Sequence, residues 1–122
     1  MKSSGGYMFG GYTDVAWSQN GGYMSSRASF LFSLKCYAGL GPLKMDVKSG
    51  NEASAVYHNS SYGPTFGGGH DLCIRFIPNQ SNTNTSYANL GHTYQLPDGV
   101  TGHCLLTGAS NFQVAEYEVF QV

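Results

Sequence analysis

Apolar and polar residues alternate along most of the chain, a pattern typical of β-strands that bury one face. The clearest alternation predicts three strands, in residues 30–35, 43–48 and 71–77. In the first of them, Phe30, Phe32 and Leu34 form the apolar face, which we expect to be buried. No stretch keeps a helical period for more than about two turns.

The first apolar segment is interrupted by two glycines. Its apolar residues share one parity along the chain: Tyr7, Phe9, Val15 and Trp17. Gly10 and Gly11 fall between them, and glycine inside a strand usually marks a β-bulge or a place where another group packs directly against the backbone. We therefore predict such a feature at these two positions.

The last segment, residues 112–122, is rich in aromatic and β-branched residues on both parities. This composition predicts a central strand covered on both faces, with a bulge near Glu116 and Glu118. The two carboxylates are two residues apart, roughly 7 Å along a strand. Such a pair could serve acid–base chemistry, but a solvated position on an outer face is the interpretation we favour.

Turn residues separate the apolar segments throughout, and many short strands with frequent turns indicate a sandwich or a barrel. Residues 79–89 are the least apolar and are predicted to form a long surface loop. With 122 residues and no linker-like stretch, residues 1–122 are expected to form a single domain.

Charge limits the kinds of partner. Six Lys and Arg against seven Asp and Glu give a formal net charge of -1, and the basic residues are scattered, which argues against binding to nucleic acid or acidic lipid. Only 11% of the residues are charged, a composition compatible with a self-associating surface.

Sequence signals for the compartment point in two directions. No apolar run is long enough for a transmembrane segment, and the N-terminus lacks the apolar centre of a secretory signal, which indicates a cytoplasmic protein. Three candidate glycosylation sequons, at Asn59, Asn79 and Asn84, would matter only in an extracellular protein, for example if the chain is a processed fragment.

The residue types that usually carry chemistry are present but not paired. The cysteines and histidines are Cys36, Cys73, Cys104, His58, His70, His92 and His103. Zinc sites and catalytic thiols are usually marked by short paired spacings or flanking motifs, and neither occurs here. We therefore predict no catalytic residue, no metal and no cofactor, while one disulfide with one free thiol stays compatible with three cysteines.

A glycine-rich run, residues 63–69, precedes His70 and Asp71. It lacks the Lys and Ser/Thr of a phosphate-binding loop, and strand residues rather than a helix follow it. We expect its glycines to allow positive φ at a turn. His70 and Asp71 are expected to fix that turn rather than to perform chemistry.

The order of these motifs resembles the TLDc domain family. The resemblance runs from about Gly6 to Val122 and depends on an ordered set of segments: Phe9-Gly-Gly-Tyr12 with Trp17, Ser29-Phe-Leu-Phe-Ser-Leu34, Ser54-Ala-Val-Tyr57, Tyr62-Gly-Pro-Thr-Phe-Gly-Gly-Gly-His-Asp-Leu72, and Phe112-Gln-Val-Ala-Glu-Tyr-Glu-Val-Phe120. The resemblance implies an all-β (minor α) fold, a two-sheet antiparallel β-sandwich. It also implies that Pro64, Phe66 and the motif glycines serve the fold before any other role; these glycines are Gly10, Gly11, Gly63, Gly67 and Gly68.

The resemblance also bears on function. Family members lack an established enzymatic mechanism, are generally intracellular, and several bind the vacuolar proton ATPase. They normally carry a helical and strand segment before the Phe-Gly-Gly block, so we expect an N-terminally shortened domain with an open sheet edge that another copy could fill.

Three functions are therefore carried forward. The first is a non-enzymatic protein-interaction module. The second is a self-assembling structural subunit, an oligomer or filament that could be extracellular and glycosylated. The third is a protein that protects against oxidative stress.

Overall fold

The computed structural model describes residues 1–18, 21–60, 62–75, 86–100, 102 and 105–121. Its strands form two antiparallel sheets, which confirms the predicted all-β sandwich. The strands in chain order are β1 Lys2–Ser3, β2 Met8–Tyr12, β3 Gly22–Met24, β4 Phe30–Lys35, β5 Leu43–Asp46, β6 Val56–His58, β7 Thr65–Phe66, β8 Leu72–Cys73, β9 Ser86–Ala88, β10 Asn111–Phe112 and β11 Val114–Glu116. Within the described residues, the one helical element is a 3-10 turn, Glu52–Ser54.

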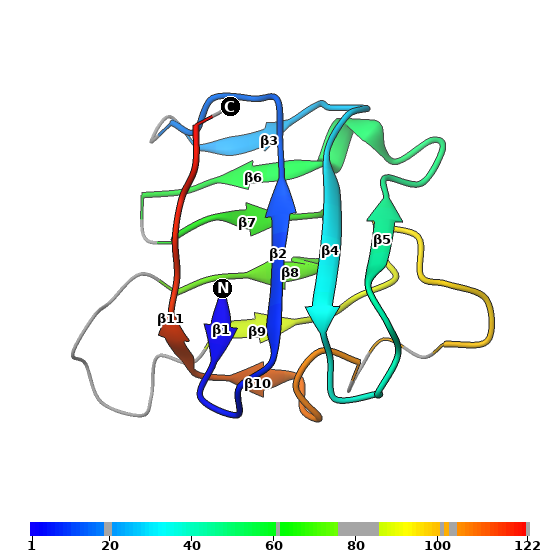
Figure 1. Cartoon of the computed structure of the whole chain (residues 1–122). Helices are drawn as coiled ribbons and strands as arrows, with labels where there is room; N and C mark the ends of the chain where they lie inside the picture. The colour runs from blue at the N-terminus through cyan, green and yellow to red at the C-terminus, as the bar shows by residue number, and fades with distance from the viewer. Residues whose placement is uncertain (19–20, 61, 76–85, 101, 103–104, 122) are drawn as a thin grey trace.

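The five-stranded sheet has the order β11-β1-β2-β4-β5, and the six-stranded sheet has the order β10-β9-β8-β7-β6-β3. Figure 1 shows the strands of the first sheet crossing those of the second at a steep angle, the orthogonal type of sheet packing. The core lies between them and contains Phe9, Leu31 and Met45 from one sheet and Val56, Phe66, Leu72, Ala88 and Phe112 from the other. Burying these side chains is the main force that holds the sheets together.

Gly10 and Gly11 sit where side chains pack directly against β2, as predicted. A Cβ at Gly10 would lie 2.7 Å from the Phe32 ring, and one at Gly11 would lie 2.6 Å from the Phe66 ring. The register between β2 and β4 also shifts between Met8 and Phe9, so the predicted irregularity is present. Two aromatic rings, one on each side of β2, occupy the space that side chains would otherwise take.

The alternation in β4 predicted the wrong buried face. Leu31 and Ser33 point into the core and are each 1% exposed, whereas Leu34 is 55% exposed. Phe32 lies on the outer side of the sheet because Gly10 leaves room for its ring. The Lys44 amine lies 4.5 Å from the centre of the Phe30 ring and covers it in part.

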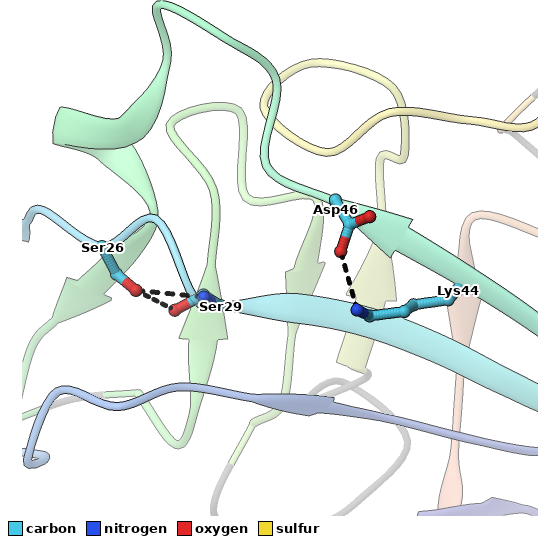
Figure 2. Close-up of polar contacts among 4 residues, drawn as sticks. All are labelled: Ser26, Ser29, Lys44 and Asp46. Atoms are coloured by element: carbon cyan, nitrogen blue, oxygen red, sulfur yellow. Dashed lines mark hydrogen bonds and ion pairs between the residues drawn. The ribbon is translucent and has the colours of Figure 1, made fainter.

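The start of β4 is fixed by a small polar network. The Ser29 amide donates to the Ser26 hydroxyl at 3.0 Å, and the two hydroxyl oxygens are 2.7 Å apart (Figure 2). Ser26 in turn donates to Asp14 at 2.6 Å. Figure 2 also shows the Lys44–Asp46 ion pair on β5, at 3.1 Å.

The prediction of a central closing strand is wrong. Residues 111–116 form two short strands, β10 and β11, and β11 is an edge strand that pairs with β1. The register shifts between Lys2 and Ser3 opposite β11, so an irregularity does occur close to Glu116. Beyond Glu116 the chain leaves the sheet, and Val119 and Phe120 are 72% and 74% exposed. Apolar residues on both parities here reflect exposed side chains rather than cover on both faces.

Two further predictions need correction. The alternation in residues 71–77 is realised as the short β8, and residues 76 and 77 lie outside the described residues. The predicted loop at 79–89 contains β9, in which Ser86 and Ala88 are buried between β8 and β10. Cross-strand pairing therefore overrides the polar composition at Ser86.

The N-terminal strand β1 flanks only the beginning of β2. Lys2 pairs with Met8, and the Met1 amine and carbonyl both bond to Phe9, at 2.7 and 3.0 Å. From Phe9 to Tyr12, β4 is the one strand that pairs with β2 in the part of the sheet that the structure describes. The side of β2 from Gly10 to Tyr12 that faces away from β4 therefore has no strand paired with it among the described residues.

Candidate interaction surface

Residues 62–75 supply side chains to both sides of the six-stranded sheet. Asp71 is the polar centre of the inner side, and its side chain is 0% exposed. Its Oδ2 accepts hydrogen bonds from the backbone amides of Thr93 and Tyr94, at 2.9 and 3.0 Å. Among the described atoms its Oδ1 has no hydrogen-bond partner, and it packs against Gly67.

Further hydrogen bonds connect the turn at Gly67 and Gly68 to the segment that contains Thr93 and Tyr94. The Gly68 amide donates to the Thr93 hydroxyl at 2.8 Å. Ala55 accepts two bonds through its carbonyl, from the Tyr94 hydroxyl at 2.7 Å and from the Gly67 amide at 2.9 Å. We call Gly67, Gly68, Asp71, Thr93 and Tyr94 the Asp71 lock, because Asp71 joins two distant segments through buried bonds.

Burial is also the main electrostatic influence on Asp71. It raises the pKa of the carboxyl above its ordinary value of 3.8, although the amides of Tyr94 and Thr93 act in the opposite direction. Burial likewise raises the pKa of Tyr94, the second fully buried titratable side chain of the lock. These groups stabilise a turn and are shielded from solvent.

The outer side of the same sheet carries a registered row of side chains. Directly paired residues share a face of an antiparallel sheet. The pairs run across all six strands in the order Tyr23, Tyr57, Thr65, Cys73, Tyr87 and Asn111. The outer face of an antiparallel sheet is usually polar and solvated, whereas three of these six residues are tyrosines.

Other rings complete a cover over the middle of this row. The Tyr57 ring lies 4.7 Å from Tyr23, 6.1 Å from Tyr62 and 5.1 Å from the ring of His70, as measured between centroids. As a result Thr65 and Cys73 are each 0% exposed, although they lie on the outer face. We call the covering residues the tyrosine face; they are Tyr23, Tyr57, Tyr62, His70, Arg75 and Tyr87.

His70 joins the turn to the tyrosine face. Its backbone has φ 53, a conformation that few non-glycine residues adopt. Its Nδ1 lies 2.6 Å from the Tyr87 hydroxyl. Burial lowers the pKa of His70, and the charge of Arg75 lowers it further. The strained backbone therefore places the imidazole among the tyrosines.

Arg75 lies at the edge of the tyrosine face. Its guanidinium carbon is 4.6 Å from the centre of the Tyr62 ring, within the range of a cation–π contact. Its backbone amide donates to the Ser86 hydroxyl at 2.9 Å, which ties the residue to β9. The face therefore offers partly exposed rings and one positioned cation, the residue types that dominate protein interfaces.

The other residues singled out by sequence are dispersed. His58 is buried, with its ring 5.3 Å from Trp17, which also packs on Phe66. His92 bonds to Thr93 on the Asp71 lock, at 2.9 Å. Glu116 and Glu118 are exposed, and Glu118 is not in a strand. The described residues contain no group of three His, Cys, Asp or Glu side chains that could hold a metal ion.

The remaining candidates divide by position. Cys36 and Cys73 are buried, and both are free thiols. Gly63 and Pro64 pair through their backbones with Ile74. The sequon Asn59 is partly buried, and its amide nitrogen lies 3.3 Å from the Tyr57 hydroxyl. Four predicted positions lie outside the described residues: Asn79, Asn84, His103 and Cys104.

Sequence reasoning missed most of the tyrosine face. Tyr23, Tyr57 and Tyr87 lie in three separate segments and meet only through strand pairing. The available signal was the count of nine tyrosines in a chain with few charges. That signal indicates an aromatic surface but does not place it.

An all-β sandwich with an aromatic outer face and a buried, hydrogen-bonded turn is the class of protein that these observations define. The chain belongs to the TLDc family, because the family model of the TLDc domain matches residues 1–122. This family is linked to protein interaction and to oxidative-stress resistance. Searches of curated proteins and of solved structures give no significant match. In the described part of the chain, no helix has the length and apolarity needed to cross a membrane.

Proposed function

We propose that the chain is a non-enzymatic protein-interaction module that contacts its partner through the tyrosine face. The observation that carries the proposal is the registered row of tyrosines that covers the outer side of the six-stranded sheet. Tyrosine and arginine are enriched at the energetic centres of interfaces because they bury large areas while keeping a polar group for a hydrogen bond.

The cysteines give less support to the third hypothesis, protection against oxidative stress by a thiol. A reactive thiol needs exposure and a lowered pKa. Cys73 is 0% exposed, and burial raises its pKa. Cys36 is also buried. A protective role would therefore act through a bound partner rather than through these two thiols.

The first partner to test is the peripheral complex of the vacuolar proton ATPase, which the family resemblance suggests. Binding of the purified chain to that complex would be measured by interferometry, with Tyr23→Ser and Arg75→Gln as variants of the face. Leu34→Ser is the matched control, because Leu34 is an exposed apolar side chain on the outer side of the other sheet.

We expect both face variants to weaken binding at least tenfold, equivalent to about 1.4 kcal/mol, while Leu34→Ser leaves binding unchanged. Equal binding by wild type and both face variants would show that the tyrosine face is not the contact surface. Failure of the wild type to bind at micromolar concentration would remove this partner.

A further inference from the structure

None of the acidic side chains forms an ion pair with Arg75 in the part of the chain that the structure describes. All seven acidic side chains belong to the described part of the chain: Asp14, Asp46, Glu52, Asp71, Asp98, Glu116 and Glu118. The described residues form one ion pair, between Lys44 and Asp46. Arg75 is therefore a half-buried cation that no acidic side chain neutralises.

The surroundings of Arg75 favour an acidic ligand with an aromatic neighbour. Stacking on Tyr62 holds the guanidinium, which can bind a carboxylate through two parallel hydrogen bonds. The Tyr57 ring continues the surface, 6.1 Å from Tyr62. A matching ligand would carry a carboxylate and, roughly 7 Å further along an extended chain, a large apolar side chain.

The C-terminal segment, residues 117–121, has this arrangement. Glu118 and Phe120 are two residues apart, and in an extended chain they project to the same side, roughly 7 Å apart. Among the large apolar residues that the structure describes, Phe120 and Val119 have the two largest exposed fractions, 74% and 72%. Burial lowers the pKa of the Met1 amine, and the charge of Glu118 acts on that amine in the opposite direction.

The segment and the tyrosine face are on different sheets of the same molecule. The segment follows β11 in the five-stranded sheet, and the tyrosine face lies on the outer side of the six-stranded sheet, with the core between them. Figure 1 shows the C-terminal segment running along the near layer. A contact between the two would therefore join separate molecules.

We propose that the tyrosine face binds the C-terminal segment of a second copy, with the Glu118 carboxylate on the Arg75 guanidinium and the Phe120 ring on Tyr57 and Tyr62. This inference rests on the proposed function, because it uses the tyrosine face as an interaction surface. The contact joins two different surfaces, so it can repeat head to tail. A formal net charge of -1 opposes such association only weakly.

The test is sedimentation equilibrium on the purified chain over a range of concentrations. One variant, Arg75→Gln, alters the face, and a second, Glu118→Gln with Phe120→Ser, alters the segment. We expect the wild type to gain mass with concentration and each variant to associate at least tenfold more weakly. An equimolar mixture of the two variants should form a 1:1 dimer and stop there, because one intact face then meets one intact segment.

Leu34→Ser serves again as the control and should associate like the wild type, and unfolding curves verify that each variant is folded. A wild type that stays monomeric at millimolar concentration would overturn the inference, as would a mixture that fails to form dimers. If Arg75→Gln still weakens binding to the proton ATPase complex in that case, the proposed function stands without self-assembly.

Discussion

The Asp71 lock and the tyrosine face both take residues from the segment 62–75, yet different interactions hold them together. In the lock, one carboxylate oxygen of Asp71 accepts buried hydrogen bonds from two backbone amides. The face uses ring contacts between partly exposed side chains, with centroids 4.7 to 6.1 Å apart. Removing the hydrogen-bond partner of a buried polar group destabilises the folded state strongly, whereas a partly exposed ring that loses a neighbour is solvated by water instead.

This difference suggests a division of roles along one motif. Asp71 points toward the core and fixes the turn, while His70, one residue earlier, places its ring on the outer side. The turn thus holds the rings in register for a partner. Substitutions in the lock should mainly change stability, and substitutions in the face should mainly change binding.

The largest effect is expected from Asp71→Ala. The change leaves the buried amides of Thr93 and Tyr94 without an acceptor, which costs about 1–3 kcal/mol for each amide. The free energy of unfolding, measured in urea, should fall by about 2–5 kcal/mol. Asp71→Asn retains one acceptor oxygen and should lose clearly less. Equal losses in the two variants would mean that the hydrogen bonds to Oδ2 do not hold the lock together.

A second substitution, Gly67→Ala, tests the packing of the lock. Gly67 has φ 91, and an added Cβ would overlap the Asp71 carboxylate. Gly50→Ala is the matched control, since Gly50 has φ 93 and open space around the Cβ position. The control should lose about 1–2 kcal/mol from the backbone conformation alone.

Gly67→Ala should lose more than Gly50→Ala, by at least about 1 kcal/mol, because the overlap adds to the backbone cost. Urea unfolding of both variants gives the comparison. If the two variants lose the same amount, the turn can shift away from Asp71, and the lock is looser than the contacts indicate.

The pH dependence of stability is a smaller effect with a definite sign. Since burial raises the pKa of Asp71 in the folded protein, the folded state binds a proton more tightly than the unfolded state does. The stability that protonation contributes is complete below the unfolded pKa of 3.8 and is lost as the pH rises through the folded pKa.

Wild type should therefore gain stability relative to Asp71→Asn as the pH is lowered from about 7 toward about 4. Burial and the charge of Arg75 lower the pKa of His70, whereas the charge of Asp71 raises it. Asp71→Asn removes that charge, so His70 destabilises the variant more than the wild type on acidification, in the same direction as the Asp71 effect. Urea unfolding of both proteins at several pH values tests the sign. A difference that moves the other way would place the folded pKa of Asp71 below 3.8.

The sequence was enough to predict the fold class and the position of the turn. Alternation located β4 and β5, and the glycines of β2 marked a close approach that the structure contains. The alternation of apolar and polar residues within β4 could not identify its buried face, because Gly10 on the neighbouring strand β2 decides where the Phe32 ring fits. They also could not identify β11 as an edge strand, since sheet order depends on distant pairings.

The candidate surface was harder to predict for the same reason. Asp71 and His70 stood out by their place after the glycine run, but their partners Thr93, Tyr94 and Tyr87 come from later segments. Local sequence therefore indicated the turn, whereas strand register assembled the face.

The smallest effect on stability, and the sharpest contrast with Asp71→Ala, is expected from Arg75→Gln. Arg75 has no acidic side chain to lose as a partner, and Gln removes mainly a partly exposed stack on Tyr62. The free energy of unfolding should change by no more than about 0.5 kcal/mol, as for most surface substitutions. A loss above about 2 kcal/mol would assign Arg75 to the fold and merge the two regions into one structural unit. A small loss with weaker binding would separate them, with the lock maintaining the geometry and the face making the contact.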